Sequence, residues 1–120
     1  MTYIEDLMPC TYHRGEIPTH LAVGWLDISQ PFTTGNTPEE FKTKLEYLTT
    51  TQATQHYRGS HGCQWCSTGL MSSYAGNGSI RVISPVTQNQ YEAPVLIAHY
   101  VRAHNYLPPE DFIVAVMSQN

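Results

Sequence analysis

The pattern of apolar and polar positions divides the first half of the chain into two elements. A compact apolar run over 21–27, interrupted only by Gly24, is typical of a buried strand. Further along, Phe41, Leu45 and Leu48 recur at i, i+4 and i+7, which places them on one face of a helix. The pattern therefore predicts a buried strand followed by an amphipathic helix.

The start of this helix has its own sequence signal. Thr37 is expected to be the N-cap, with Pro38 at the first helical position and Glu40 three residues after the cap. A Thr and a Glu at this spacing can bond reciprocally to the free backbone N–H groups of the first turn, and proline is tolerated there because its missing N–H is not needed. We therefore expect a capping box at Thr37.

The second half of the chain alternates between turn signals and short apolar segments. After a polar, glycine-rich stretch over 52–78, residues 79–84 alternate as a strand does, and a loop returns the chain to a short strand around Tyr91. A helix from Pro94 to His104 and a short helix over 112–116 follow, separated by Pro108 and Pro109. These elements predict an α+β fold over 1–120, a small single domain with a short antiparallel sheet and about three helices.

Composition narrows the possible partners. The chain has 120 residues, of which 41% are hydrophobic, so it can bury one modest core. Only 13% of the residues are charged, the net charge is −4, and the six Lys and Arg residues are dispersed. Because no basic stripe is available to neutralise phosphates, nucleic acid is not an expected partner. The first residues lack the features of a signal peptide and no long apolar run is present, so we expect a cytoplasmic protein without a membrane span.

Two pairs of metal-ligand residues carry the strongest chemical signal. Cys63 and Cys66 form a Cys-x-x-Cys pair in a glycine-rich stretch, and His99 and His104 lie on the helix predicted after the two strands. Two thiolates on a knuckle and two imidazoles on a helix can complete a tetrahedron around Zn²⁺. With three cysteines a closed disulfide framework is not expected, and Cys10 is the spare residue. The predicted site is therefore a zinc-finger-like Cys₂His₂ centre, with a redox pair or two unliganded thiols as the alternatives.

His61 makes a second set of ligands possible. On an ideal helix His99 and His104 lie about 140° apart, so both can bind one ion only if the helix ends near His104. If it does not, His61, which precedes Cys63 by two residues, can replace His104 as the fourth ligand. We favour the set with His104. The remaining histidines are expected to be ordinary hydrogen-bonding residues: His13, His20 and His56.

A catalytic role for this metal is less favoured by the sequence. Four protein ligands would fill the coordination shell, whereas a catalytic zinc usually keeps an open position for water. No catalytic residue is assigned, although a three-ligand site with His61 or Glu92 nearby as a base is an alternative. The aromatic residues near the site are expected to pack around it, or else to line a recognition pocket with Arg58 or Arg81: Trp65, Tyr91, Tyr100 and Tyr106.

Several blocks of the chain resemble a family of short bacterial proteins of unknown function. The blocks cover most of the chain and are Gly24–Asp27 with Pro31–Gly35, Arg58–Cys66, Gly76–Val82 with Tyr91–Pro94, and His99–Phe112. In these blocks the motifs RG-x-H-x-C-x-x-C and H-Y-V-x-x-H-x-Y-x-P-P stand out. The resemblance implies a stand-alone domain and supports the metal site, but it brings no established activity.

Three functions are compatible with these observations. The first is a non-enzymatic, zinc-stapled module that binds another protein, which the filled metal shell and the low charge favour. The second is a small zinc-dependent enzyme. The third is a binder of a small polar or nucleotide-like ligand, with tyrosines and an arginine lining its pocket.

Overall fold

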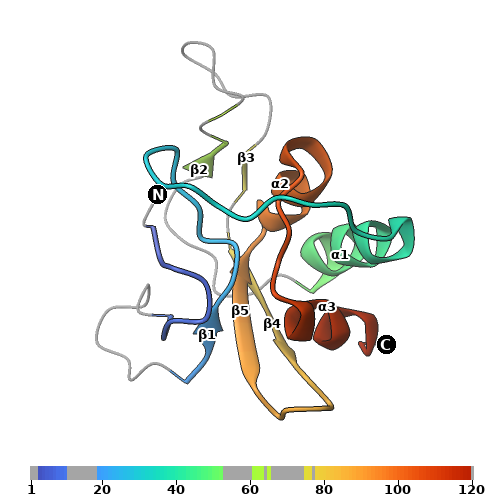
Figure 1. Ribbon diagram of the computed structural model, residues 1–120. Coiled ribbons are helices and arrows are strands. Elements are labelled where there is room, and N and C mark those ends of the chain that lie inside the picture. The colour runs from blue at the N-terminus through green and yellow to red at the C-terminus, as the bar shows by residue number, and fades with distance from the viewer. Residues whose placement is uncertain are drawn as a thin grey trace.

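The computed structural model describes residues 3–10, 19–52, 61–63, 65, 75–76 and 78–119 (Figure 1). Within these residues the backbone of residues 61, 62, 75 and 76 is described without their side chains. The elements in chain order are β1 (Leu21–Ala22), α1 (Glu39–Thr51), β2 (His61–Gly62), β3 (Ala75–Gly76), β4 (Ser79–Ile83), β5 (Gln90–Pro94), α2 (Ile97–His104) and α3 (Glu110–Met117). The expected α+β class with three helices is confirmed.

The larger sheet has the strand order β1-β5-β4. β4 and β5 form the expected antiparallel pair, with Ser79 opposite Pro94 and Val82 opposite Tyr91. β1 joins β5 in the parallel direction, with Leu21 opposite Tyr91, so the sheet is mixed. β1 is shorter than the apolar run that predicted it because Gly24 takes a φ of 80° and turns the chain away. A second, two-stranded antiparallel sheet joins β2 to β3.

The start of α1 differs from the expectation. The helix begins at Glu39, one residue later than predicted, with Pro38 in an extended conformation as the N-cap and no side-chain capping bond. The extended backbone at Pro38 moves Thr37 one residue outside the helix, where its buried Oγ1 has no hydrogen-bond partner among the described residues. The predicted capping box is therefore wrong. Glu39 and Glu40 still place negative charge in the first turn, where the helix dipole favours it.

The other two predicted helices are present, and α2 ends where it was predicted to end. Pro94 remains in β5, so α2 begins at Ile97 rather than at Pro94. It ends at His104, where Asn105 adopts the left-handed conformation with a φ of 57° that commonly terminates helices. The short C-terminal helix is confirmed as α3, which buries Phe112, Ala115 and Val116.

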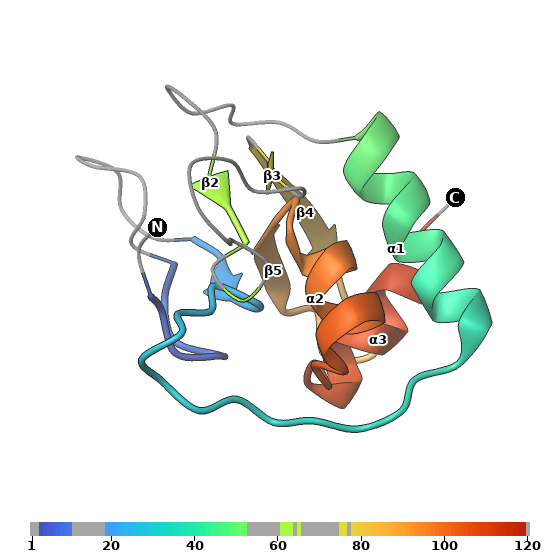
Figure 2. The same cartoon turned by 90° about the horizontal axis from the view of Figure 1, so that it is seen from above.

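The helices gather on one side of the larger sheet. Figures 1 and 2 show α1, α2 and α3 together beside β4 and β5, with the N-terminal arm at the other edge of the sheet next to β1. Arg102 of α2 makes exposed ion pairs with Glu39 and Glu46 of α1. Among the residues that the structure describes, no helix has the length and apolar character needed to cross a membrane.

The segment between β1 and α1 crosses the molecule near the end of the larger sheet that leads into α2 (Figure 1). Backbone hydrogen bonds join this segment to the residues that follow α2. The N–H of Gly35 donates to the carbonyl of Asn105 at 3.0 Å, and the N–H of Leu107 donates to the carbonyl of Thr33 at 2.9 Å. The main core contains large buried side chains from both halves of the chain: Phe41, Leu45, Tyr91, Tyr100, Tyr106 and Phe112. Trp25 lies in a second, smaller cluster with Ile4, Cys10 and Ala22. The residues around the end of α2 are therefore held from several directions.

Candidate metal centre

Helix α2 brings two histidines together. Ile97, Tyr100 and Val101 form its buried face, and His99 and His104 are half-buried beside that face. The two imidazole rings have centroids 5.0 Å apart and stand nearly perpendicular, at 83°. They meet although His104 comes five positions after His99, and His104 is the last residue of the helix, directly before the left-handed Asn105. The expectation that the helix ends at His104 is confirmed.

Cys63 completes a group of three ligand-type side chains. It follows β2 directly, is fully buried, and its Sγ lies 3.4 Å from Nε2 of His104. One ligand atom from each of Cys63, His99 and His104 lies within 4.8 Å of the others. In a tetrahedral zinc site with the usual bond lengths, ligand atoms are about 3.3 to 3.8 Å apart. The group is therefore close to the size of a metal shell and could hold a metal ion.

The protonation state of His99 suits this role. Burial lowers the pKa of His99, and the neighbouring His104 lowers it further. A lowered pKa keeps the imidazole neutral at physiological pH, and the neutral form has the free ring nitrogen that binds a metal. The environment therefore favours the ligating form of His99.

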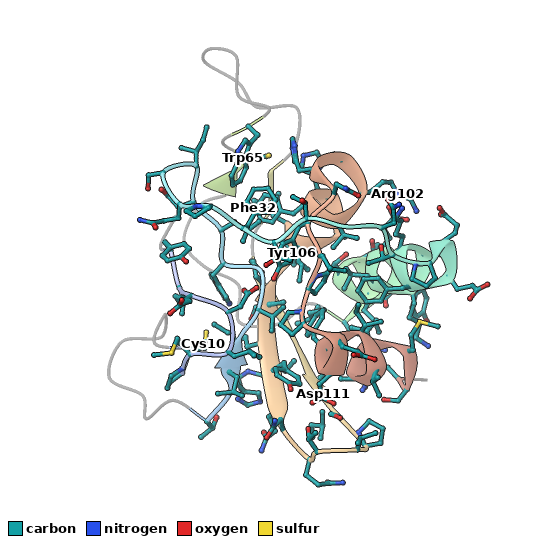
Figure 3. The ribbon with its side chains drawn as sticks, in the orientation of Figure 1. Cys10, Phe32, Trp65, Arg102, Tyr106 and Asp111 are labelled. Atoms are coloured by element: carbon teal, nitrogen blue, oxygen red, sulfur yellow. The ribbon has the colours of Figure 1, made fainter. Side chains whose placement is uncertain are left out.

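Aromatic side chains cover the cluster. The ring of Trp65, two residues after Cys63, has its centroid 5.7 Å from those of His104 and Tyr100. Phe32, from the segment between β1 and α1, packs edge-on against Trp65, with the two ring centroids 5.4 Å apart (Figure 3). The expected aromatic packing is thus found for Trp65 and Tyr100. Tyr91 instead packs against Phe112 and donates its hydroxyl to Asp111, in the part of the sheet that α3 covers.

Two of the residues considered as ligands cannot be placed. Cys66 lies outside the described residues, and of His61 only the backbone is described, paired with Gly76 in the small sheet. The structure therefore brings together three members of the predicted set and shows that His104 lies in the cluster. The choice of Cys66 as the fourth ligand stays a prediction.

Glu92 and Arg81, which the sequence offered as a base and as a ligand-binding residue, are bound to each other. Glu92 is buried, accepts a hydrogen bond from Oγ of Ser79 at 2.6 Å, and pairs with Nε of Arg81 at 3.3 Å. Its carboxylate therefore links β4 to β5 and is not a member of the metal cluster. Arg58, the other arginine considered, is outside the described residues.

Residues 2–117 match a protein family described as "Domain of unknown function (DUF7919)". The chain belongs to the DUF7919 family. This confirms the resemblance to a family of unknown function that its sequence blocks indicated, while the description of DUF7919 assigns no activity. No match was found among curated proteins or among solved structures.

In the DUF7919 chain, the hydrogen bonds that Asp6 accepts were not predicted from the sequence. Asp6, in the N-terminal arm, accepts a hydrogen bond from the N–H of Gly24 at 3.0 Å and another from the Tyr106 hydroxyl at 2.6 Å. Burial and the charge of Asp6 raise the pKa of Tyr106. Tyr106 follows His104 by two residues, so Asp6 holds the chain just beyond the cluster. No local pattern reveals this contact, because its partners are far apart in sequence.

Proposed function

We propose that the chain is a small zinc-binding protein with a structural Cys₂His₂ centre that acts as a non-enzymatic protein-interaction module. The zinc ligands in this proposal are Cys63, Cys66, His99 and His104. The observation that carries it is the convergence of Cys63, His99 and His104 on a volume the size of one metal shell. Cys66 completes the set because a Cys-x-x-Cys knuckle commonly supplies two thiolates to one ion.

The donor set supports zinc over other common ions. Thiolate and imidazole are borderline-soft ligands that suit Zn²⁺, whereas Mg²⁺ and Ca²⁺ prefer carboxylate and carbonyl oxygens. The cluster of three that the described residues form contains no carboxylate. Zinc in a reducing compartment would also keep the two cysteines from forming a disulfide.

A structural role is supported by the surroundings of the cluster. Cys63 is fully buried and Trp65 lies over His104, so solvent has limited access from these sides. Glu92, the candidate base, is bound to Ser79 and Arg81. The low charge of the chain, −4 overall with 13% charged residues, favours another protein over nucleic acid as the partner.

A small zinc-dependent enzyme is the second candidate. It is favoured by one observation, namely that the described cluster has three members, which is also the usual number of protein ligands at a catalytic zinc. In that case the fourth position would hold water, and Cys66 would not bind the ion.

Cobalt substitution separates these two candidates. Co²⁺ bound by two thiolates and two imidazoles should give the absorption of a tetrahedral site with strong sulfur-to-cobalt charge transfer. Cys66→Ser should reduce that charge-transfer intensity, and His61→Gln should leave it unchanged. Added azide should not alter the spectrum of a filled shell. A spectrum that responds to azide would overturn the structural reading and favour the enzyme, and failure to bind Co²⁺ or Zn²⁺ would overturn both.

The proposed binding of another protein is tested with purified components. Proteins retained by the zinc-loaded, tagged chain from cell extract would be identified, purified and titrated against it. We expect saturable binding that the metal-free Cys63→Ser variant loses. If none of the purified proteins binds saturably, the chain is not an interaction module of this kind.

A further inference from the structure

An open groove runs along the outward side of α1, beside the end of α3. Figures 1 and 2 show α1 at the outer edge of the molecule. Two large apolar side chains of the groove, Tyr47 and Met117, remain 53% and 44% exposed. Side chains three and four positions apart lie on one face of a helix, so the α1 residues of the groove form one continuous stripe. The residues that line this α1 groove are Glu39, Glu40, Thr43, Lys44, Tyr47 and Met117.

The α1 groove carries both signs of charge. Lys44 donates a hydrogen bond to the backbone carbonyl of Gln119, which holds its ammonium group beside the groove. An ammonium group has three donors, so two of them stay available to another acceptor. Glu40 lies four positions earlier on the same stripe, and among the described residues no hydrogen bond or ion pair holds it. Glu39, in contrast, is bound to Arg102 of α2. The groove therefore presents one carboxylate and one ammonium group that can each bind a group of opposite charge.

These two charges make the α1 groove complementary to itself. When two identical helices pack antiparallel about a two-fold axis between positions 40 and 44, Glu40 of each copy faces Lys44 of the other. The two-fold symmetry forms this ion pair twice, whereas a partner with a single sign of charge would match only one of the two groups. The net charge of −4 and the 13% share of charged residues also keep the repulsion between copies small. The charges of the groove therefore favour a second copy of this chain as the occupant.

We propose that the α1 groove is an interface between two copies of this chain, in which Glu40 of each copy pairs with Lys44 of the other. The pairing would remove the exposed side chains of Tyr47 and Met117 from water, which adds an apolar contribution. This inference goes beyond the proposed function, because it needs neither the metal nor a different protein. A standard protein interface buries about 800 Å² on each partner, and a single helix stripe offers less. The dimer is therefore expected to be weak.

Sedimentation equilibrium of the purified chain measures this self-association. The mean mass should rise from that of one chain toward that of two between about 1 μM and about 1 mM protein. Tyr47→Ala removes a large apolar side chain from the interface and should raise the dissociation constant about 10-fold or more. Val86→Ala is the matched control, because Val86 is 74% exposed in the turn between β4 and β5, outside the groove, and it should leave the constant unchanged. An unmodified chain that stays monomeric up to about 1 mM would overturn the inference.

Charge reversal distinguishes a paired interface from a folding defect. Glu40→Lys and Lys44→Glu each set like charges against one another across the two-fold axis, so each variant alone should dissociate about 10-fold more readily or more. An equimolar mixture of the two variants sets the positive charges of one copy against the negative charges of the other. The mixture should therefore associate to within about 3-fold of the unmodified chain. Mixing cannot repair a misfolded chain, so a mixture that associates no better than its separate components would overturn the proposed pairing.

The outcome of this experiment is independent of the proposed zinc centre. Glu40 and Lys44 lie on α1 and are not among the proposed ligands, so both variants should keep the zinc content of the unmodified chain. A chain that dimerises without binding zinc would support this inference and contradict the metal centre. A zinc-loaded chain that stays monomeric would do the opposite.

Discussion

Gly24 shows how strongly a single residue constrains the chain beside the core. Its φ of 80° is a conformation that side chains with a Cβ rarely adopt, and an added Cβ would lie 2.7 Å from Cδ1 and 2.8 Å from Cγ1 of the buried Ile97. Strained backbone and overpacking act in the same direction, so Gly24→Ala should lower the free energy of unfolding by about 3 kcal/mol. Chemical denaturation of the two proteins measures this difference.

Gly35 provides the matched control. It has no positive φ, and an added Cβ would meet mainly Cδ2 of Leu107 at 2.9 Å, the end of a flexible and only partly buried side chain. Gly35→Ala should therefore cost less than about 1 kcal/mol. Equal losses in the two variants would show that backbone strain at Gly24 does not matter.

Among single residues, the metal-ligand types Cys and His could be recognised from the sequence. Residues whose role depends on a contact with a distant part of the chain could not. The spacing of His99 and His104 with Cys63 was enough to predict a metal cluster, and the structure brings these three together. Nothing in the sequence pairs Asp6 with Tyr106, and nothing marks Tyr100 as a buried tyrosine whose hydroxyl has no acceptor among the described residues. Such partners are set by tertiary packing, which local patterns do not encode.

At the scale of elements, Asp111 joins α3 to the turn between β4 and β5. Its carboxylate accepts hydrogen bonds from the hydroxyls of Ser84, Thr87 and Tyr91, and Ser84 is itself buried in that turn (Figure 3). The bonds from Ser84, Thr87 and Tyr91, in that order, lower the pKa of Asp111. Three donors from one hairpin thus hold the first turn of α3 in place.

This contact predicts a pH dependence. Because the pKa of Asp111 is lower in the folded protein than in the unfolded chain, its contribution to stability is complete above the ordinary aspartate pKa of about 3.9. It is lost as the pH falls through the lower, folded-state value. Asp111→Asn should reduce the thermal midpoint at neutral pH, and the difference from the unmodified protein should shrink below about pH 4.

The control for this prediction is Glu110→Gln, one residue earlier on the exposed side of α3. It should leave the thermal midpoint nearly unchanged, because surface substitutions away from specific contacts usually have small effects. A gap between Asp111→Asn and the unmodified protein that stayed constant through the acid range would show that ionisation of Asp111 does not stabilise the fold.

Helices and strands with a long apolar pattern could be predicted from the sequence, and those with a short pattern could not. The apolar spacing of α1 and α3 and the alternation of β4 were long enough to fix their type. The parallel pairing of β1 was not predictable, because two residues carry no period and their partner lies in β5, far along the chain. The capping box at Thr37 failed because Pro38 shifted the helix start by one residue.

For the whole molecule, the proposed zinc would link the small β2–β3 sheet to helix α2. Cys63 follows the small β2–β3 sheet, whereas His99 and His104 belong to α2, which packs with α1 beside the larger sheet. An ion bound to both would close a loop of about 40 residues, and closing long loops removes entropy from the unfolded chain. A small core gains proportionally more from such a link than a large one.

Metal content measured together with unfolding tests this account most directly. Elemental analysis of the purified protein should find one zinc per chain, and Cys63→Ser and His99→Ala should each lose it. Removing the ion with a chelator should lower the thermal midpoint and broaden the unfolding transition, and adding Zn²⁺ back should restore both. His20→Ala, outside the cluster, should keep its zinc. A purified protein that contains no metal and unfolds with the same sharp transition before and after chelation would contradict the proposed zinc centre.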